Sequence, residues 1–316
     1  MSDAEKAGLR AERGDGVWRF KLLQERIVWT DGILGDVSID GASVSDPVLI
    51  RGDGQILYTL ASVVDDTEMG VTHVVRGADH VTNTGTQIQI MQALGGTVPT
   101  FAHHSLLTGP QGEALSKRLG TLALRDLREA GIAPQALLSL MSRLGSSDPV
   151  ELRTEMSEII EGFDISRFGS APTKFDAEDL KPLTAHYLQT LTLADVAEDI
   201  RALGVPDAQA ERFWAVTREN ITTLHDLKGW WTMFTEGAAP VIADEDREFI
   251  AQAMAVLPEG PFDTETWGKW TTEVKEATGR KGKGLFMPLR LALTGQAHGP
   301  DMSSVMPLLQ AVKARG

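Results

Sequence analysis

The chain contains no cysteine in its 316 residues. Disulfides, thiolate metal sites and a catalytic cysteine are therefore excluded, and a reducing, cytosolic setting fits this absence. Long apolar runs are also lacking, since no stretch approaches the ~20 apolar residues that a membrane span needs. The charged opening residues do not form the apolar centre of a secretory signal. We therefore expect no membrane partner.

A general excess of positive charge is missing as well. The 30 lysines and arginines are outnumbered by 44 aspartates and glutamates, which gives a net charge of −14. This balance argues against a basic coat for nucleic acid, but it does not exclude a local basic patch on an acidic body.

The hydrophobic pattern predicts an α/β region near the N-terminus. Residues 71–75 are expected to form a buried strand and 101–107 a second strand. Between them a helix is expected to start at a cap on Asn83 or Thr84, with an apolar face made of Ile88, Met91 and Leu94. A strand, a helix and a strand at this spacing indicate parallel pairing and a doubly wound α/β domain.

The rest of the chain shows different patterns. The first 50 residues contain short strand-like pieces joined by Asp-Gly and Gly-Asp turns. Pro134 is expected to start a helix with Leu137, Leu138, Met141 and Leu144 on its buried face. From about residue 176 onward nearly every segment has a helical pattern, which predicts a helical second half.

Several polar residues follow the two expected parallel strands. Ligands bind beyond the carboxyl ends of such strands, so Arg76, Asp79 and His80 should share a crevice with Leu107 and the loop after it. Arg76 could grip a ligand carboxylate, although an ion pair with a nearby aspartate, Asp65 or Asp66, is the alternative that spacing alone favours. Tyr58 could offer its hydroxyl to a substrate, or it could be an ordinary half-buried tyrosine.

A glycine-rich loop carries Ser116, Lys117 and Arg118. Glycines at 109 and 112 let the backbone approach an anion, and Lys117 can place a point charge on a phosphate. A solvated basic turn is the alternative. The loop lies beyond the end of a predicted parallel strand, and this position supports the phosphate-binding interpretation.

The four histidines near these strands do not predict a metal site. Their spacing is not that of a helix-borne pair, and there is no cysteine to help. The adjacent residues His103 and His104 should face opposite sides of a strand. We therefore expect no protein-bound zinc.

The densest basic cluster consists of Arg280, Lys281, Lys283 and Arg290. Glycines are interleaved with these residues, so the backbone can approach a ligand closely. Such a patch on an acidic protein can bind nucleic-acid phosphates with an affinity that falls steeply as salt rises. A solvated turn at the start of a helix is the alternative.

Taken together, these stretches resemble the bacterial glutamyl-tRNA synthetases, a class I family. The segments that carry the resemblance are "DPVLIRGDGQILYTLASVVDD", "MGVTHVVRGADHVTNTGTQIQIMQALG", "ALSKRLG" and "GRKGKGLFMPLRLALTGQAHGP". The similarity runs from about Trp18 to the end of the chain. It implies the second half of a class I Rossmann-like nucleotide-binding fold, followed by an all-α C-terminal helical region. It also implies a cytoplasmic protein.

The resemblance implies roles for individual residues. Tyr58 and Arg76 match positions that hold glutamate, and Asp79, His80 and Leu107 match positions that line the ATP adenosine pocket. Lys117 matches the second signature lysine, whose charge would stabilise the triphosphate during adenylation, with Ser116 and Arg118 supporting ATP. ATP would arrive with Mg²⁺. The cluster Arg280, Lys281, Lys283 and Arg290 would contact tRNA, of either the glutamate or the glutamine isoacceptor.

The same resemblance implies four regions. These are the remainder of an acceptor-stem-binding insertion (1–60), the second half of the catalytic domain (61–108), the signature-lysine loop with stem-contact helices (109–189) and a helical anticodon-binding domain (190–316).

Two departures from the family pattern matter. Ala114 stands where the family usually has its first signature lysine, and no His-x-Gly-His segment occurs anywhere. We therefore expect an N-terminally incomplete glutamate–tRNA ligase that does not activate glutamate alone. The alternative is a non-catalytic tRNA-binding module derived from a synthetase.

Overall fold

The computed structural model describes residues 1–14, 16–113 and 123–315. They fall into two compact units, which are described separately. The first unit comprises residues 1–116, 141–150 and 159–176. The second unit comprises residues 117–140, 151–158 and 177–316.

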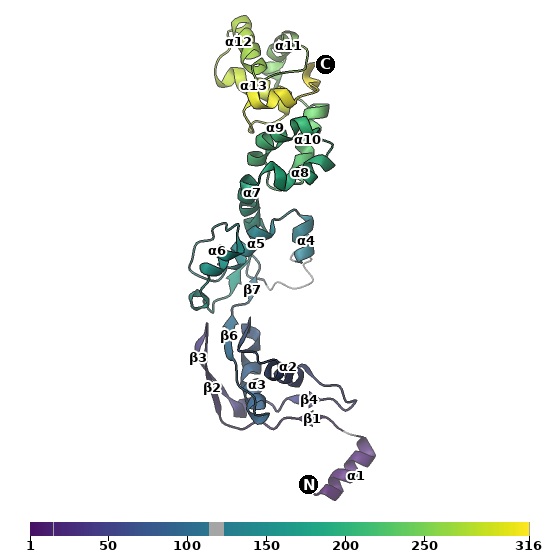
Figure 1. The fold of residues 1–316 in the computed structure, drawn as a ribbon, viewed down its shortest axis with the longest axis vertical. Coiled ribbons are helices and arrows are strands. Elements are labelled where there is room, and N and C mark those ends of the chain that lie inside the picture. Colours follow the sequence, from purple (N-terminus) through teal and green to yellow (C-terminus); the bar gives the residue numbers. More distant parts are fainter. Residues whose placement is uncertain (15, 114–122, 316) are drawn as a thin grey trace. The chain divides into compact units, whose positions relative to one another are not determined.

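The described strands all belong to the first unit (Figure 1). They are β1 (Trp18–Arg19), β2 (Arg26–Asp31), β3 (Gly35–Asp40), β4 (Val48–Ile50), β5 (His73–Gly77), β6 (Thr100–His104), β7 (Leu107–Thr108) and β8 (Thr173–Lys174).

The α-helices are spread along the whole chain. They are α1 (Asp3–Arg13), α2 (Tyr58–Glu68), α3 (Val81–Ala93), α4 (Leu124–Glu129), α5 (Pro134–Met141), α6 (Met156–Glu161), α7 (Leu180–Thr190), α8 (Leu193–Ala202), α9 (Asp207–Thr217), α10 (Asp226–Glu236), α11 (Arg247–Ala255), α12 (Thr266–Thr278), α13 (Lys283–Thr294) and α14 (Met302–Val305).

The centre of the first unit is the predicted strand–helix–strand unit. β5 and β6 pair in parallel, and α3 connects them, which confirms the predicted α/β architecture. Eight consecutive residues of α3, from Thr84 to Met91, are buried. Ile88 packs with Ile27 and Phe101, whereas Ile90 and Met91 pack on Val63 of α2. The helix is therefore enclosed on more than one face.

The antiparallel hairpin of β2 and β3 lies beside this unit. Its six residue pairs include Ile27 opposite Ile39, and Gly35 supplies the positive φ of +72° at the start of β3. The backbone N–H of Gly32 donates to the carbonyl of Phe101 at 2.8 Å. This contact brings the end of β2, and Asp31 with it, next to β6.

Some predicted details in this region are wrong. α3 begins at Val81, directly after a short 3-10 helix at Ala78–His80, so neither Asn83 nor Thr84 is its cap. Leu94 is 53 % exposed because it lies one residue past the helix end. Val75 is 56 % exposed and no residue of β5 is buried, so the prediction of a buried strand is wrong.

The expected strand 101–107 is split in two. β6 ends at His104, and Leu107 starts β7, which pairs in parallel with β8. His103 is buried and His104 is exposed, so the prediction that the two face opposite sides is confirmed.

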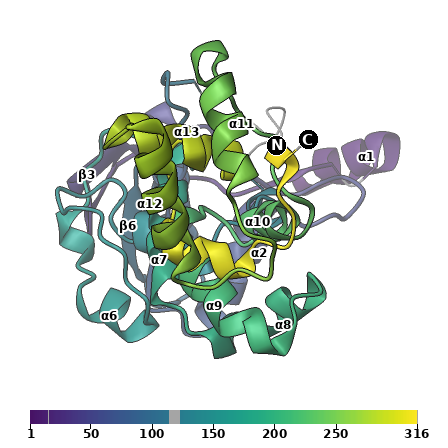
Figure 2. The ribbon, with the colours of Figure 1, turned by 90° about the horizontal axis from the view of Figure 1, so that it is seen from above.

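The second unit is helical, as predicted, and has one large apolar core. Helices α11, α12 and α13 lie side by side (Figure 2), with Trp270 and Leu289 buried between them. In α5 the buried residues are Ala136, Ser139 and Leu140, whereas the predicted core residues Leu138 and Met141 are about two-fifths exposed (40 % and 41 %). No helix in the described part of the chain is long and apolar enough to cross a membrane.

Candidate functional site

The guanidinium of Arg76 is held by four neutral side chains. Its Nε donates to Nε2 of His103 at 3.4 Å, and Nη1 donates to the hydroxyl of Tyr58 at 3.3 Å. Nη2 donates to Oγ1 of Thr84 and to Oε1 of Gln87, both at 2.7 Å. The arginine is thus fixed in direction without any carboxylate among these partners.

The expected ion pair of Arg76 with Asp65 or Asp66 does not form. Among the described residues no carboxylate lies within ion-pair distance of this guanidinium. A guanidinium has five N–H donors, so one Nη1 donor remains without a partner in the described structure. Together with the proton of the half-exposed Tyr58 hydroxyl, it can bind an anion, and the unpaired positive charge favours one.

A buried histidine–aspartate pair, His103 and Asp31, contacts Arg76 through the hydrogen bond to His103. The side chains of His103 and Asp31 are both fully buried, and His103 Nδ1 lies 2.5 Å from Asp31 Oδ2. Oδ1 of Asp31 accepts from the backbone N–H of His103 at 2.9 Å and from those of Ile33 and Leu34 at 3.1 Å each. Burial raises the pKa of Asp31, but the side-chain and backbone hydrogen bonds outweigh it and leave this pKa below its usual value. Asp31 is therefore ionised at neutral pH.

Two other predicted site residues lie near Tyr58 and Arg76. Asp79 and His80 belong to the 3-10 helix that follows β5, and Asp79 Oδ2 lies 3.8 Å from His80 Nε2. The His80 ring centroid is 6.0 Å from that of Tyr58. The first unit therefore brings Tyr58, Arg76 and His80 together at the end of β5.

Leu107 lines a different surface. It contributes to an apolar pocket of about 210 Å³, to which Val75 and Phe168 also belong and Tyr58 and Arg76 do not. Ser116, Lys117 and Arg118 lie outside the described residues. Their expected convergence with Arg76 stays a prediction.

The basic cluster of the second unit contains two arginines with structural contacts. Arg280 Nη1 lies 2.5 Å from Oδ1 of Asp246, and its guanidinium carbon sits 4.0 Å from the Phe249 ring centroid. Arg290 Nη2 donates to the Pro300 carbonyl at 2.5 Å. Burial lowers the pKa of Arg290, and the charge of Asp301 opposes this shift.

The two lysines of this cluster differ from the arginines. Lys281 and Lys283 are exposed and flank Gly282, which adopts a positive φ of +55° at the N-cap of α13. Both lysine side chains are therefore accessible to solvent, where they can bind the phosphates of a nucleic acid.

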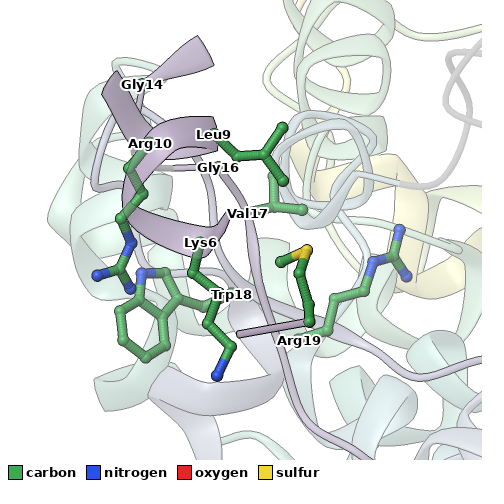
Figure 3. Close-up of a pocket in the computed structure, with 9 residues that line it drawn as sticks. Lys6, Leu9, Arg10, Gly14, Gly16, Val17, Trp18 and Arg19 are labelled. Carbon is green, nitrogen blue, oxygen red and sulfur yellow. The ribbon is translucent and has the colours of Figure 1, made fainter. Parts of the chain in front are cut away.

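A second basic site was not predicted from the sequence. Lys6 and Arg10 of α1 line a pocket of about 430 Å³ with Trp18 and Arg19. Figure 3 shows the side chains of Lys6, Arg10 and Trp18, which line this pocket together. Trp18 is 60 % exposed, so its ring is free to stack. The available signal was the cationic spacing of residues 6 and 10, one helical turn apart.

Metal ligands are not grouped in the described residues. No three histidine, aspartate or glutamate side chains there could share an ion. The expected absence of zinc stays a prediction for the whole chain.

Family models define the class of this architecture. Residues 1–182 match the model of the class I tRNA synthetase catalytic domain (E and Q), and residues 177–314 match an anticodon-binding domain. The chain is thus part of a class I aminoacyl-tRNA synthetase. Its parallel α/β unit, which carries Arg76 near the end of β5, belongs to the catalytic domain, and the helical region that follows binds the anticodon in this class.

The chain belongs to the glutamate–tRNA ligase family, as the resemblance predicted. It is 78 % identical over 315 residues to glutamate–tRNA ligase 1 of Roseobacter denitrificans, covering 100 % of this chain and 71 % of that protein. It is 76 % identical to glutamate–tRNA ligase 2 of a Ruegeria species, covering 100 % of this chain and 72 % of the relative.

A solved structure supports the same assignment. A glutamate tRNA ligase of Elizabethkingia meningosepticum, crystallised with its amino acid, superimposes with a TM-score of 0.81 at 28 % identity. The match covers 98 % of this chain and 68 % of that one. Members of the family are ligases that bind tRNA, glutamate and ATP.

Proposed function

We propose that Arg76 and Tyr58 bind a carboxylate of glutamate in this chain. The observation that carries the proposal is the arrangement of Arg76, which is fixed by neutral side chains and keeps its charge unpaired among the described residues. One Nη1–H and the Tyr58 hydroxyl proton then form the ligand-facing edge. An arginine that served only as a structural ion pair would have a carboxylate partner.

The ATP-binding residues are proposed from the family. By the family resemblance Asp79, His80 and Leu107 line the adenosine site, although in the described structure Leu107 lines an apolar pocket that does not include Asp79 or His80. Ser116, Lys117 and Arg118 bind the phosphates of ATP, which enters with Mg²⁺. In a family member that activates glutamate, a glutamate carboxylate oxygen attacks the α-phosphorus, the bond to the bridging oxygen breaks, and pyrophosphate leaves with the electron pair. Lys117 stabilises the charge on the departing phosphates.

The tRNA contacts are proposed for the basic segment at the start of α13. Lys281 and Lys283 contact phosphates directly, because both are exposed. Arg280 holds the start of this segment through Asp246, and Arg290 binds the Pro300 carbonyl in the segment after α13. The bound tRNA is a glutamate or glutamine isoacceptor, and residues 190–316 form the region that reads its anticodon.

The 316 residues do not activate glutamate by themselves in our proposal. They contain no His-x-Gly-His segment, which in the family contributes contacts to ATP. The second candidate is a tRNA-binding module without catalysis, which the exposed Lys281 and Lys283 favour. A cytoplasmic location stays a prediction from the family.

One set of assays separates these functions. Glutamate-dependent ATP–pyrophosphate exchange should be absent with this chain, and L-glutamate should bind it measurably in an NMR titration. Robust exchange would overturn the claim of inactivity. Salt-sensitive tRNA binding without any glutamate binding would leave only the second candidate.

A further inference from the structure

We propose that Asp31 and His103 are positioning residues that hold Arg76 in the direction needed to bind the glutamate carboxylate. The inference rests on the proposed function of Arg76. Neither Asp31 nor His103 reaches the ligand-facing edge, since both side chains are fully buried. They affect glutamate affinity only indirectly, by way of the hydrogen bond that Arg76 Nε donates to His103 Nε2.

The strand register places the two residues side by side. Arg76 of β5 is the parallel-ladder partner of His103 of β6, so both side chains leave the sheet on the same face. The imidazole stacks on the Phe101 ring at 6.2 Å with an angle of 16° between the planes, and the Trp29 ring lies 6.5 Å away. These contacts fix the plane of the imidazole and hold Nε2 toward Arg76.

Asp31 decides which imidazole nitrogen carries the proton. Its carboxylate is ionised, so the short contact at Oδ2 requires a donor, and His103 Nδ1 must hold a proton. Nε2 of the neutral ring is then an acceptor for Arg76 Nε–H, which always carries its proton. A proton on Nε2 would place two donors against each other and a second cation beside Arg76.

Thr84 and Gln87 complete the arrangement. Thr84 Oγ1 lies 2.9 Å from His103 Nε2 and accepts from Arg76 Nη2. Gln87 accepts from Arg76 through Oε1 and donates through Nε2 to Ser62 Oγ at 2.9 Å, which fixes its amide orientation. Four donors of Arg76 thus have defined partners among the described residues, and the remaining Nη1 donor is available to a ligand.

Asp31→Asn is the sharpest test, because it changes one atom of the pair. Asparagine keeps an Oδ1 for the three backbone N–H groups, so the turn after β2 is preserved. Its NH₂ group replaces Oδ2 and donates to Nδ1, which moves the imidazole proton to Nε2. That proton then opposes Arg76 Nε–H.

Two further variants are compared with Asp31→Asn, one that removes the imidazole and one that serves as a control. His103→Phe keeps an aromatic ring for the stack on Phe101 and removes both nitrogens. Asp36→Asn is the matched control, since Asp36 lies on the partner strand β3, is exposed and accepts a hydrogen bond from Thr30.

The readouts are NMR spectra of the whole chain. Long-range ¹H–¹⁵N spectra of the histidine side chains report the tautomer of His103, and the Nε–H resonance of Arg76 reports its hydrogen bond. We expect an unprotonated Nε2 in the wild type and a protonated one in Asp31→Asn. L-Glutamate affinity should fall about tenfold in Asp31→Asn and in His103→Phe, the size of one missing hydrogen bond to a charged group. It should not change in Asp36→Asn.

The possible outcomes are distinguishable. A wild-type His103 protonated at Nε2 overturns the inference, whether or not Asp31→Asn folds. An unaltered Arg76 resonance and an unaltered glutamate affinity in a folded Asp31→Asn overturn it as well. If Arg76→Ala binds L-glutamate as well as the wild type, the proposed function fails instead, and the tautomer spectra still decide whether the pair orients Arg76.

Discussion

Arg76 in the first unit and Arg280 in the second are both arginines that the sequence places in binding sites. Arg76 contacts uncharged side chains, and its charge has no carboxylate partner in the described structure. Arg280 is paired with Asp246 and packed on the ring of Phe249. The same residue type keeps its charge without a carboxylate partner among the described residues of one region and is part of the packing in the other.

The difference lies in what neutralises the charge. A neutral network fixes a guanidinium and leaves its electrostatic potential for an incoming anion. A carboxylate neutralises that potential within the protein. Both guanidiniums also lie over an aromatic ring, Arg76 over Phe101 at 5.6 Å and Arg280 over Phe249 at 4.0 Å, so the carboxylate Asp246 is the difference. We therefore expect Arg76 substitutions to affect binding, and Arg280 substitutions to affect stability.

The largest expected effect is on glutamate binding by Arg76→Ala. Removing a charge-assisted interaction of about 2–3 kcal/mol should weaken L-glutamate binding roughly 30- to 150-fold, measured by NMR titration. The matched control is Arg51→Ala, since Arg51 is exposed and bonded to Gln55. Equal affinities of the two variants would remove Arg76 from the glutamate site.

The next effect concerns the stability of the second unit. Arg280→Ala removes the interaction with Phe249 and leaves the largely buried Asp246 unpaired, so the free energy of unfolding should fall by about 2 kcal/mol in urea titrations. Arg247→Ala is the control, because its ion pair with Asp244 is exposed and should contribute less than about 0.5 kcal/mol. Comparable decreases in both variants would contradict a structural role specific to Arg280.

A smaller effect is expected for the two exposed lysines. Lys281→Ala with Lys283→Ala should reduce the slope of log affinity for tRNA against log salt by about 2, one unit for each phosphate that a lysine no longer neutralises. The control is Lys275→Ala, on the exposed surface of α12. An unchanged slope in the double variant would show that the loop does not contact tRNA.

The smallest effect concerns acid pH and Asp31. The pKa of Asp31 lies below that of an unfolded aspartate, about 3.9, because hydrogen bonds from His103 and backbone N–H groups outweigh burial. The resulting stabilisation is fully present above about pH 4 and is lost as the pH falls through the lowered pKa. The gap in unfolding free energy between the wild type and Asp31→Asn should narrow below about pH 4. A gap that stays constant down to about pH 2 would contradict this assignment.

The sequence predicted the strand–helix–strand unit and the importance of Arg76, because apolar runs and a strand-end arginine are local signals. It did not predict the partners of Arg76. Asp31 lies in a hairpin 72 residues before His103, and that distance is bridged only by tertiary contacts. The sequence places His103 and His104 on opposite sides of a strand, which is right, but it does not show that His103 accepts a hydrogen bond from Arg76.

Errors in the helices have a similar origin. A helical face can be chosen from spacing, but the packing partner decides which of two adjacent faces is buried. In α5 the small residues Ala136 and Ser139 are buried and the larger Leu138 is exposed. Likewise, Arg280 and Lys281 are neighbours in the sequence, and only the folded loop separates the paired arginine from the exposed lysine.

Helix α3 has a consequence for attempts to improve this protein. Four of its eight consecutive buried residues are polar, namely Thr84, Thr86, Gln87 and Gln89, and Gln89 donates to and accepts from the backbone of Leu23. A stabilisation strategy that replaces buried polar residues by leucine would select these positions first. Leucine at these positions would leave the backbone of Leu23 and the guanidinium of Arg76 without the hydrogen bonds they now make, so the free energy of unfolding would fall. In our proposal it would also weaken glutamate binding, because Thr84 and Gln87 hold Arg76.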